Sequence, residues 1–182
     1  MMILFEGPDK SGKTTLLRNI EEVRPNSGVW KNTIFKPNSS VYSQGKIAGL
    51  YLGFYEAMKI AGEGRYPLFV DRSHITELVY APIKRNYEPD IEFWREYEPT
   101  MDAVVVYVDT PADTIIKRLM AEGDDYVNAD ELVRIKFAYD DYFRRFCRLT
   151  VIRIDGSKTE TEMVIELNHK LNEYLRKENK DR

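Results

Sequence analysis

The chain has very little cysteine and histidine and no long apolar run. Its 182 residues include one cysteine, Cys147, and two histidines. A single cysteine excludes an internal disulfide and leaves no cysteine-based metal site. No apolar run approaches the ~20 residues that a membrane-spanning helix needs. The first apolar run covers only Met1 to Phe5 and has no basic region before it, so we expect no signal peptide. We therefore expect a protein of the reducing cytoplasm that makes no membrane contact.

An excess of positive charge is also missing. The 27 basic residues are outnumbered by 30 acidic ones, and the net charge is −3. A protein that grips many phosphates of a nucleic acid usually has a basic domain or stripe, so we expect no nucleic-acid partner. Hydrophobic residues make up 43% and charged residues 31% of the sequence, which is an ordinary balance for a globular protein. The length favours one domain, residues 1–182.

Short apolar runs alternate with segments of helical periodicity along the whole chain. The run from Ala103 to Val108 is almost wholly apolar, as in a strand that is covered on both faces. Alternation of this kind predicts an α/β fold with a parallel sheet between two layers of helices. The expected strands are 2–5, 29–35, 67–70, 103–108 and 149–154. The expected helices are 13–24, 43–61, 73–80, 90–97, 112–121, 129–146 and 159–176.

One motif lies between the first strand and the first helix. Residues 7–14, Gly-Pro-Asp-Lys-Ser-Gly-Lys-Thr, fit the phosphate-loop pattern G-x-x-x-x-G-K-[ST]. Gly7 and Gly12 let the backbone curl so that successive N–H groups point at phosphate oxygens, and the following helix directs its positive dipole end there. Lys13 can reach the β and γ phosphates of ATP, and the Thr14 hydroxyl can ligate Mg²⁺. The remaining residues expected at the ATP phosphates are Ser11 and Thr15. We expect Lys13 to face solvent when no ligand is bound.

The sequence resembles the thymidylate kinases, which are nucleoside monophosphate kinases with a P-loop. The resemblance covers most of the chain, although only the first motif is highly specific. It rests on residues 5–15, Asp71-Arg72 after the third strand, Thr76, Val79 and Tyr80, Gly45-Lys46 with Tyr51-Leu52, and residues 106–111. It implies a three-layer fold with a five-stranded parallel sheet, a short lid near residues 118–128, a homodimer, and ATP and Mg²⁺ as donor and cofactor.

The resemblance also implies roles for charged residues near the loop. It places Lys10 at the γ-phosphoryl group during transfer, Asp9 near the 3′-hydroxyl of the acceptor sugar, and Arg118 against the adenine of ATP. Each has a plainer interpretation, namely a solvated lysine, a turn-bracing aspartate and a solvated helix arginine. Asp71 stands at the carboxyl end of a strand, where α/β sheets bind ligands, and can hold Mg²⁺ through water. Arg72 can bind the acceptor phosphate bidentately, unless it only pairs with Asp71.

The middle of the chain departs from the thymidylate kinase pattern. The family carries there a phenylalanine that stacks on thymine and an arginine that holds the acceptor phosphate. Residues 43–64 contain no arginine. Phe54 or Tyr51 can stack on a base, and the residues that can replace the arginine are Lys46, Lys59 and Arg65. The lid segment is acidic and lacks the arginines of some relatives.

These patterns predict ATP-dependent phosphoryl transfer to a deoxynucleoside monophosphate, dTMP or a related, modified pyrimidine nucleotide. The first alternative is a kinase that acts on the hydroxyl of a deoxynucleoside or of a modified base in DNA. A hydroxyl acceptor needs a general base, whereas a phosphate acceptor, with its second pKa near ~6, needs none. Nucleoside kinases carry a glutamate just past the second strand, where this chain has Lys36. The second alternative is a non-catalytic nucleotide-binding regulator, against which Arg72 and Lys10 argue.

Overall fold

A parallel β-sheet forms the centre of the protein. The computed structural model describes residues 1–23, 29–31, 44–61, 67–124 and 126–178. The strands lie in the order β2-β3-β1-β4-β5, and every neighbouring pair is parallel. Four strands of four to seven residues make up the body of the sheet, and β2, with three residues, extends the edge beside β3. The strands are β1 (Met2–Glu6), β2 (Val29–Lys31), β3 (Leu68–Asp71), β4 (Ala103–Asp109) and β5 (Thr150–Asp155).

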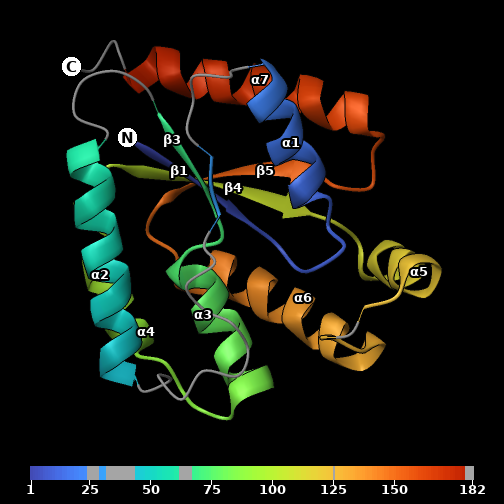
Figure 1. The fold of residues 1–182 in the computed structure, drawn as a ribbon, viewed down its shortest axis with the longest axis horizontal. Coiled ribbons are helices and arrows are strands. Elements are labelled where there is room, and N and C mark those ends of the chain that lie inside the picture. Colours follow the sequence, from blue (N-terminus) through green and yellow to red (C-terminus); the bar gives the residue numbers. More distant parts are fainter. Residues whose placement is uncertain (24–28, 32–43, 62–66, 125, 179–182) are drawn as a thin grey trace.

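Helices cover both faces of this sheet (Figure 1). The alternation of side chains along each strand divides the core in two. On β1, Ile3 and Phe5 pack with α1 and α7, whereas Met2 and Leu4 face the cluster formed with α2, α3, α4, α5 and α6. The expected α/β fold with helices on both sides of a parallel sheet is therefore confirmed. The helices are α1 (Lys13–Val23), α2 (Gln44–Ala61), α3 (His74–Tyr80), α4 (Ile91–Tyr97), α5 (Ala112–Glu122), α6 (Ala129–Arg145) and α7 (Glu160–Glu178).

The helix ends show where the sequence analysis was incomplete. A π-helical turn, Ala81–Arg85, continues directly from α3, and a short 3-10 turn, Glu98–Thr100, continues from α4; neither was expected. The last helix runs to Glu178, two residues beyond the expected end. Its final turn carries basic residues, which stabilise a helix C-terminus, and Lys177 pairs with Glu173, one turn earlier, at 2.8 Å. Residues 32–35 of the expected second strand lie outside the described residues.

The strand register brings two chain segments to one edge of the sheet. Phe5 of β1 lies opposite Asp71 of β3, and Glu6 lies opposite Tyr107 of β4. The segments that follow β1 and β3 therefore leave the sheet side by side at its carboxyl edge, which is where open α/β sheets bind their ligands. Within the part of the chain that the structure describes, no helix combines the length and the apolarity needed to cross a membrane.

Candidate active site

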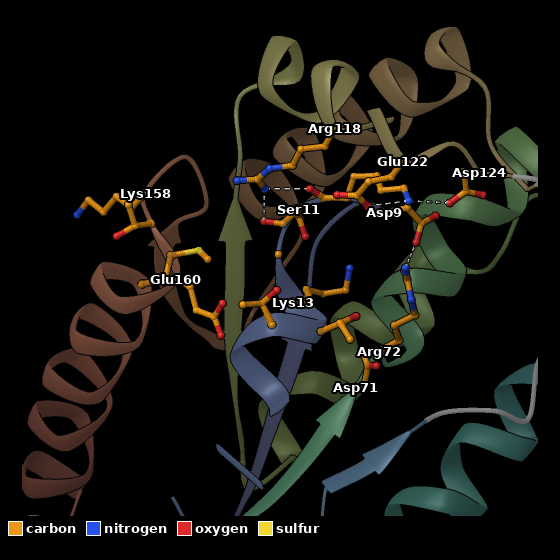
Figure 2. Close-up of a pocket in the computed structure, with 16 residues that line it drawn as sticks. Asp9, Ser11, Lys13, Asp71, Arg72, Arg118, Glu122, Asp124, Lys158 and Glu160 are labelled. Atoms are coloured by element: carbon orange, nitrogen blue, oxygen red, sulfur yellow. Dashed lines mark hydrogen bonds and ion pairs between the residues drawn. The ribbon is translucent and has the colours of Figure 1, made fainter. Parts of the chain in front are cut away.

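A cavity of about 600 Å³ opens at this edge of the sheet (Figure 2). It lies above the amino end of α1, between the carboxyl end of β3, the end of α5 and the turn that precedes α7. Most of its lining is polar or charged. The lining residues are Asp9, Lys10, Ser11, Gly12, Lys13, Thr14, Thr15, Asp71, Arg72, Arg118, Glu122, Asp124, Lys158, Thr159, Glu160 and Met163. The fold thus collects almost all the expected phosphate-site residues in one place.

The loop between β1 and α1 has a backbone that glycine makes possible. Gly7 and Gly12 have φ values of 145° and 103°, which side-chain-bearing residues rarely adopt. A Cβ atom on Gly7 would also lie 2.9 Å from the carbonyl oxygen of Val108, in the neighbouring strand. Lys10 has a φ of 62°, so the chain turns sharply between the two glycines. The loop therefore has the curled form that the motif predicts.

Lys13 is buried beneath this loop. Its ammonium group donates hydrogen bonds to the carbonyl oxygens of Gly7, at 2.6 Å, and Pro8, at 2.9 Å. Only 5% of the residue is exposed, so the expectation that Lys13 faces solvent was wrong. Burial, reinforced by the positive charge of Arg72, lowers the pKa of Lys13 to about 8. The two carbonyl groups at the start of the loop draw the ammonium inward, which a reading of the motif alone does not reveal.

Arg72 and Asp9 form an ion pair across the cavity (Figure 2). Tyr80 holds the same carboxylate, because its hydroxyl donates to Asp9 Oδ2 at 2.9 Å and accepts from the Asp9 N–H at 3.2 Å. Burial by itself would raise the pKa of the Asp9 carboxyl, but the charges of Arg72 and Lys13 outweigh it and leave that pKa lowered. Asp9 is thus an ionised group and a weak base. The plainer interpretation of Arg72, a pair with Asp71, does not apply, because its partner comes from the phosphate loop.

Two buried polar atoms at the end of β3 have no hydrogen-bond partner among the described residues. They are Arg72 Nη1 and Asp71 Oδ1. Buried groups of this kind are rare in folded proteins unless a ligand, an ion or water satisfies them. Thr14 is exposed at the amino end of α1 and lines the same cavity. Asp71 and Thr14 provide the oxygen donors that Mg²⁺ prefers, so these residues fit the expected metal.

The end of α5 and the residues just after it supply counter-ions to Lys10. The Lys10 ammonium lies 3.1 Å from Glu122 Oε2 and 3.9 Å from Asp124 Oδ2. Lys10 is therefore not the freely solvated lysine of the plainer interpretation. The acidic lid residues, which the sequence analysis noted only as a departure from the family, lie in direct contact with the phosphate loop.

Arg118 donates hydrogen bonds to the backbone of the phosphate loop. Its Nη1 donates to the carbonyl oxygens of Lys10, at 3.0 Å, and Ser11, at 3.2 Å, and its Nη2 donates to that of Gly156 at 2.8 Å. The guanidinium thereby links the phosphate loop to the turn between β5 and α7. Arg118 is not a solvated helix arginine, and its contact with adenine stays a prediction.

The two aromatic residues expected at the acceptor base do not line this cavity. Tyr51 is 3% exposed and packs in the core, with its ring 6.0 Å from both Tyr55 and Trp94. Phe54 is half-buried on the same helix and meets Tyr55 edge-on. Lys46 is exposed near the start of α2. Lys36 and Arg65 lie outside the described residues.

Sequence reasoning missed several residues that shape the site. Glu122 and Asp124 reach the loop from a distant part of the chain, and Lys158, Thr159 and Glu160 line the cavity from the turn before α7. Glu6 was also missed, although its signal was visible. It is a charged residue that directly follows the apolar run 2–5 and precedes the first glycine of the phosphate loop.

Comparison with known proteins identifies the fold. No family model matches the chain. A structure of deoxyadenosine kinase from M. mycoides with dCMP and dCDP bound superposes with a TM-score of 0.65 at 14% identity, over 95% of this chain and 100% of that one. The YorR protein from Bacillus subtilis, in complex with phosphorylated GDP, has a TM-score of 0.65 at 22% identity, over 93% and 98% of the two chains. A dATP-bound structure of the same deoxyadenosine kinase has a TM-score of 0.61 at 12% identity, over 94% and 100%. The chain therefore has the fold of P-loop nucleoside and nucleotide kinases.

Proposed function

We propose that the protein transfers the γ-phosphoryl group of ATP to a deoxynucleoside monophosphate, dTMP or a related pyrimidine nucleotide, and releases the diphosphate. One observation carries this proposal. The phosphate loop and the guanidinium of Arg72, which has a buried N–H group without a partner among the described residues, open into the same cavity. A loop for the donor phosphates and a cation for the acceptor phosphate thus line the same open cavity. Residues 1–182 act as one domain, with residues 118–128 as its lid.

The donor phosphates lie along the loop in this proposal. Backbone N–H groups from Ser11 to Thr15 and the amino end of α1 attract the anion. The Lys13 ammonium exchanges the carbonyl oxygens of Gly7 and Pro8 for phosphate oxygens. The negative phosphate favours the protonated form of Lys13 and so keeps its positive charge in place. Lys10 leaves its lid partners and meets the charge that grows on the γ-phosphoryl group during transfer.

Thr14 and Asp71 are the donors that would hold the metal ion. Thr14 would ligate Mg²⁺ through its hydroxyl, and the unpartnered Oδ1 of Asp71 would hold a metal-bound water. When bound, Mg²⁺ neutralises charge on the β and γ phosphates. The chain's own contribution is to orient these two oxygen donors on separate rigid elements, the first turn of α1 and the end of β3.

The acceptor phosphate meets Arg72. A guanidinium fork matches two phosphate oxygens, and Nη1 is available for one of them. The phosphate then competes with Asp9 for Arg72, and the released carboxylate can hold the acceptor sugar hydroxyl. A nucleoside acceptor brings no phosphate to displace Asp9 from Arg72, so the pKa of Asp9 stays lowered and its carboxylate is a poor general base for such an acceptor. An acceptor that is already ionised suits such a site better than one that must lose a proton.

A deoxynucleoside is the second candidate for the acceptor. It is favoured by the fold shared with a deoxyadenosine kinase and by the presence of an ionised carboxylate, Asp9, in the cavity. In that reaction Asp9 would accept the proton of the 5′-hydroxyl, and Arg72 would orient the carboxylate. The two candidates differ in one requirement, which is the presence of a phosphate on the acceptor.

A substrate screen separates the two. Purified protein is incubated with Mg-ATP and, one at a time, the common nucleosides and nucleoside monophosphates, and ADP release is followed. We expect turnover with pyrimidine deoxynucleoside monophosphates and none with the matching nucleosides. Turnover of nucleosides alone would make the second candidate correct. A protein that binds ATP but releases no ADP with any acceptor would favour a regulator.

A further inference from the structure

Glu6 is a buried carboxylate directly below the phosphate loop. It is the last residue of β1, and Gly7 begins the loop immediately after it. The residue has no exposed surface. A carboxylate removed from water in this way is costly unless hydrogen bonds replace its hydration. Its role in the molecule therefore depends on the groups that donate to it.

Four donors from two helices surround the Glu6 carboxylate. Oε1 accepts from the backbone N–H and the hydroxyl of Ser73, both at 2.6 Å. Oε2 accepts from the hydroxyl of Thr76 at 2.7 Å and from that of Tyr139 at 2.8 Å. Both oxygens are thus fully used. Ser73 is also the N-cap of α3, since its hydroxyl accepts from the N–H of Ile75, so Glu6 fixes the point where that helix begins.

The residue between β3 and this helix start is Arg72. Its φ is 70°, a left-handed conformation that is unfavourable for a residue with a side chain. Two consecutive N–H groups tie this turn to β1. The Arg72 N–H donates to the carbonyl oxygen of Phe5 at 3.0 Å, and the Ser73 N–H donates to Glu6. Such a backbone conformation persists only where the surroundings determine it, and here they do so through the end of β1.

We infer that Glu6 is a positioning residue that holds Arg72 in its left-handed turn and so directs the guanidinium into the cavity. Glu6 lies below the loop and does not line the cavity, so it acts through Arg72 and not on a ligand. The consequence for the acceptor rests on the proposed function, since it assumes that Arg72 binds the acceptor phosphate. The consequence for Arg72 itself does not depend on any activity.

The natural test is Glu6→Gln, which keeps the size of the side chain and one carbonyl oxygen but removes the charge. Glu77→Gln is a matched control. Glu77 is also buried, at 3% exposed, and lies on the same helix, α3, where its carboxylate pairs with Arg85 and accepts a hydrogen bond from Tyr87 instead of contacting Ser73 or Arg72. Should Glu6→Gln fail to fold, Tyr139→Phe removes one of the four donors and retains the ring that packs beside Tyr107.

The first measurement does not depend on catalytic activity. Protein labelled with ¹⁵N-arginine is studied by NMR, and the Arg72 guanidinium signal is assigned by its loss in Arg72→Lys. We expect a restrained, slowly rotating guanidinium in the wild type and in Glu77→Gln, and a rapidly averaged one in Glu6→Gln, with Tyr139→Phe in between. An unchanged Arg72 signal in Glu6→Gln, or an equal change in Glu77→Gln, would overturn the inference.

The second measurement links positioning to the acceptor. Glu6→Gln should raise the acceptor KM roughly tenfold or more, because a misplaced binding group costs about that much, while the KM for ATP stays the same. In an Arg72→Ala background the same change should add almost nothing, since both act through one group. If the NMR signal changes but the acceptor KM does not, Glu6 positions Arg72 as inferred and the proposed role of Arg72 at the acceptor is wrong.

Discussion

Replacing Lys13 by methionine should change how the stability of the protein depends on pH. Methionine has a similar length and packs in the same space but cannot take a proton. In the folded protein, burial and the charge of Arg72 lower the pKa of Lys13 from 10.5 to about 8. The unfolded chain therefore binds the proton more tightly than the folded one. Below pH 8 the wild type carries the whole cost of burying a charged ammonium, which amounts to about 3 kcal/mol.

This cost is relieved as the pH rises from 8 to 10.5, because in that range the folded protein has lost the Lys13 proton while the unfolded chain still holds it. Between pH 7 and pH 10 the wild type should thus gain about 2 kcal/mol of stability relative to Lys13→Met. The difference in the free energy of unfolding between the wild type and Lys13→Met at a single pH is less informative than its change with pH. The variant also loses two hydrogen bonds to loop carbonyls, each worth about 1.5–3 kcal/mol when the donor is charged. These bonds set the offset between the two proteins at low pH, whereas the change of that offset with pH reports the loss of the Lys13 proton.

The assay is urea unfolding of both proteins at pH 7, 8, 9 and 10. All other titrating groups are shared and cancel in the difference. Lys117→Met is the control, because Lys117 lies on α5 with 80% of its side chain exposed, so this change removes a lysine without removing a buried ammonium. A difference for Lys13→Met that is constant with pH would refute the reasoning, since it would mean that the ammonium is not buried in the folded protein.

Four further changes separate the roles of residues in the cavity. Arg72→Ala should raise the acceptor KM strongly. Lys10→Ala should instead lower kcat by a factor of order 10², with little change in either KM. Steady-state kinetics with both substrates varied will show whether the two variants differ in this way. Thr14→Val should weaken the apparent Mg²⁺ affinity by roughly tenfold, read from kcat as Mg²⁺ is titrated, and an unchanged titration would remove Thr14 from the metal site. Neutralising Glu122 and Asp124 together should lower the Kd for ATP about three- to tenfold at low salt, because both line the cavity proposed for the triphosphate and compete for Lys10. Calorimetry that finds equal or weaker ATP binding would contradict this.

The loop and the sheet were predictable because their determinants are local. Residues 7–14 are contiguous, and the conformations that Gly7 and Gly12 adopt follow from the absence of a Cβ atom. The strand Ala103–Asp109 was predictable from its apolar run alone, and its interior is fully buried. Asp71 and Arg72 could be placed at the same edge as the loop, since parallel strands of one sheet end together.

The rest depends on contacts between distant residues. Lys10 meets Glu122 across 112 positions, and Glu6 meets Tyr139 across 133, so no spacing rule links them. Tyr51 shows a different limit. An aromatic residue on an amphipathic helix can pack in the core or bind a base, and periodicity does not distinguish the two. Lys13 was assigned to the right loop but to the wrong environment, because the carbonyl groups that bury it become neighbours only when the loop folds.

The most direct test of the proposed function follows the labelled γ-phosphate of ATP. The protein is incubated with Mg²⁺, γ-labelled ATP and dTMP, and in a parallel reaction with thymidine in place of dTMP, and the products are separated by chromatography. We expect the label in the β position of dTDP, no labelled product from thymidine, and the loss of both ATP turnover and dTDP in Lys13→Met. Label that appears in dTMP from thymidine but never in dTDP, or only in inorganic phosphate, would contradict the proposal that this cavity transfers phosphate to a nucleoside monophosphate.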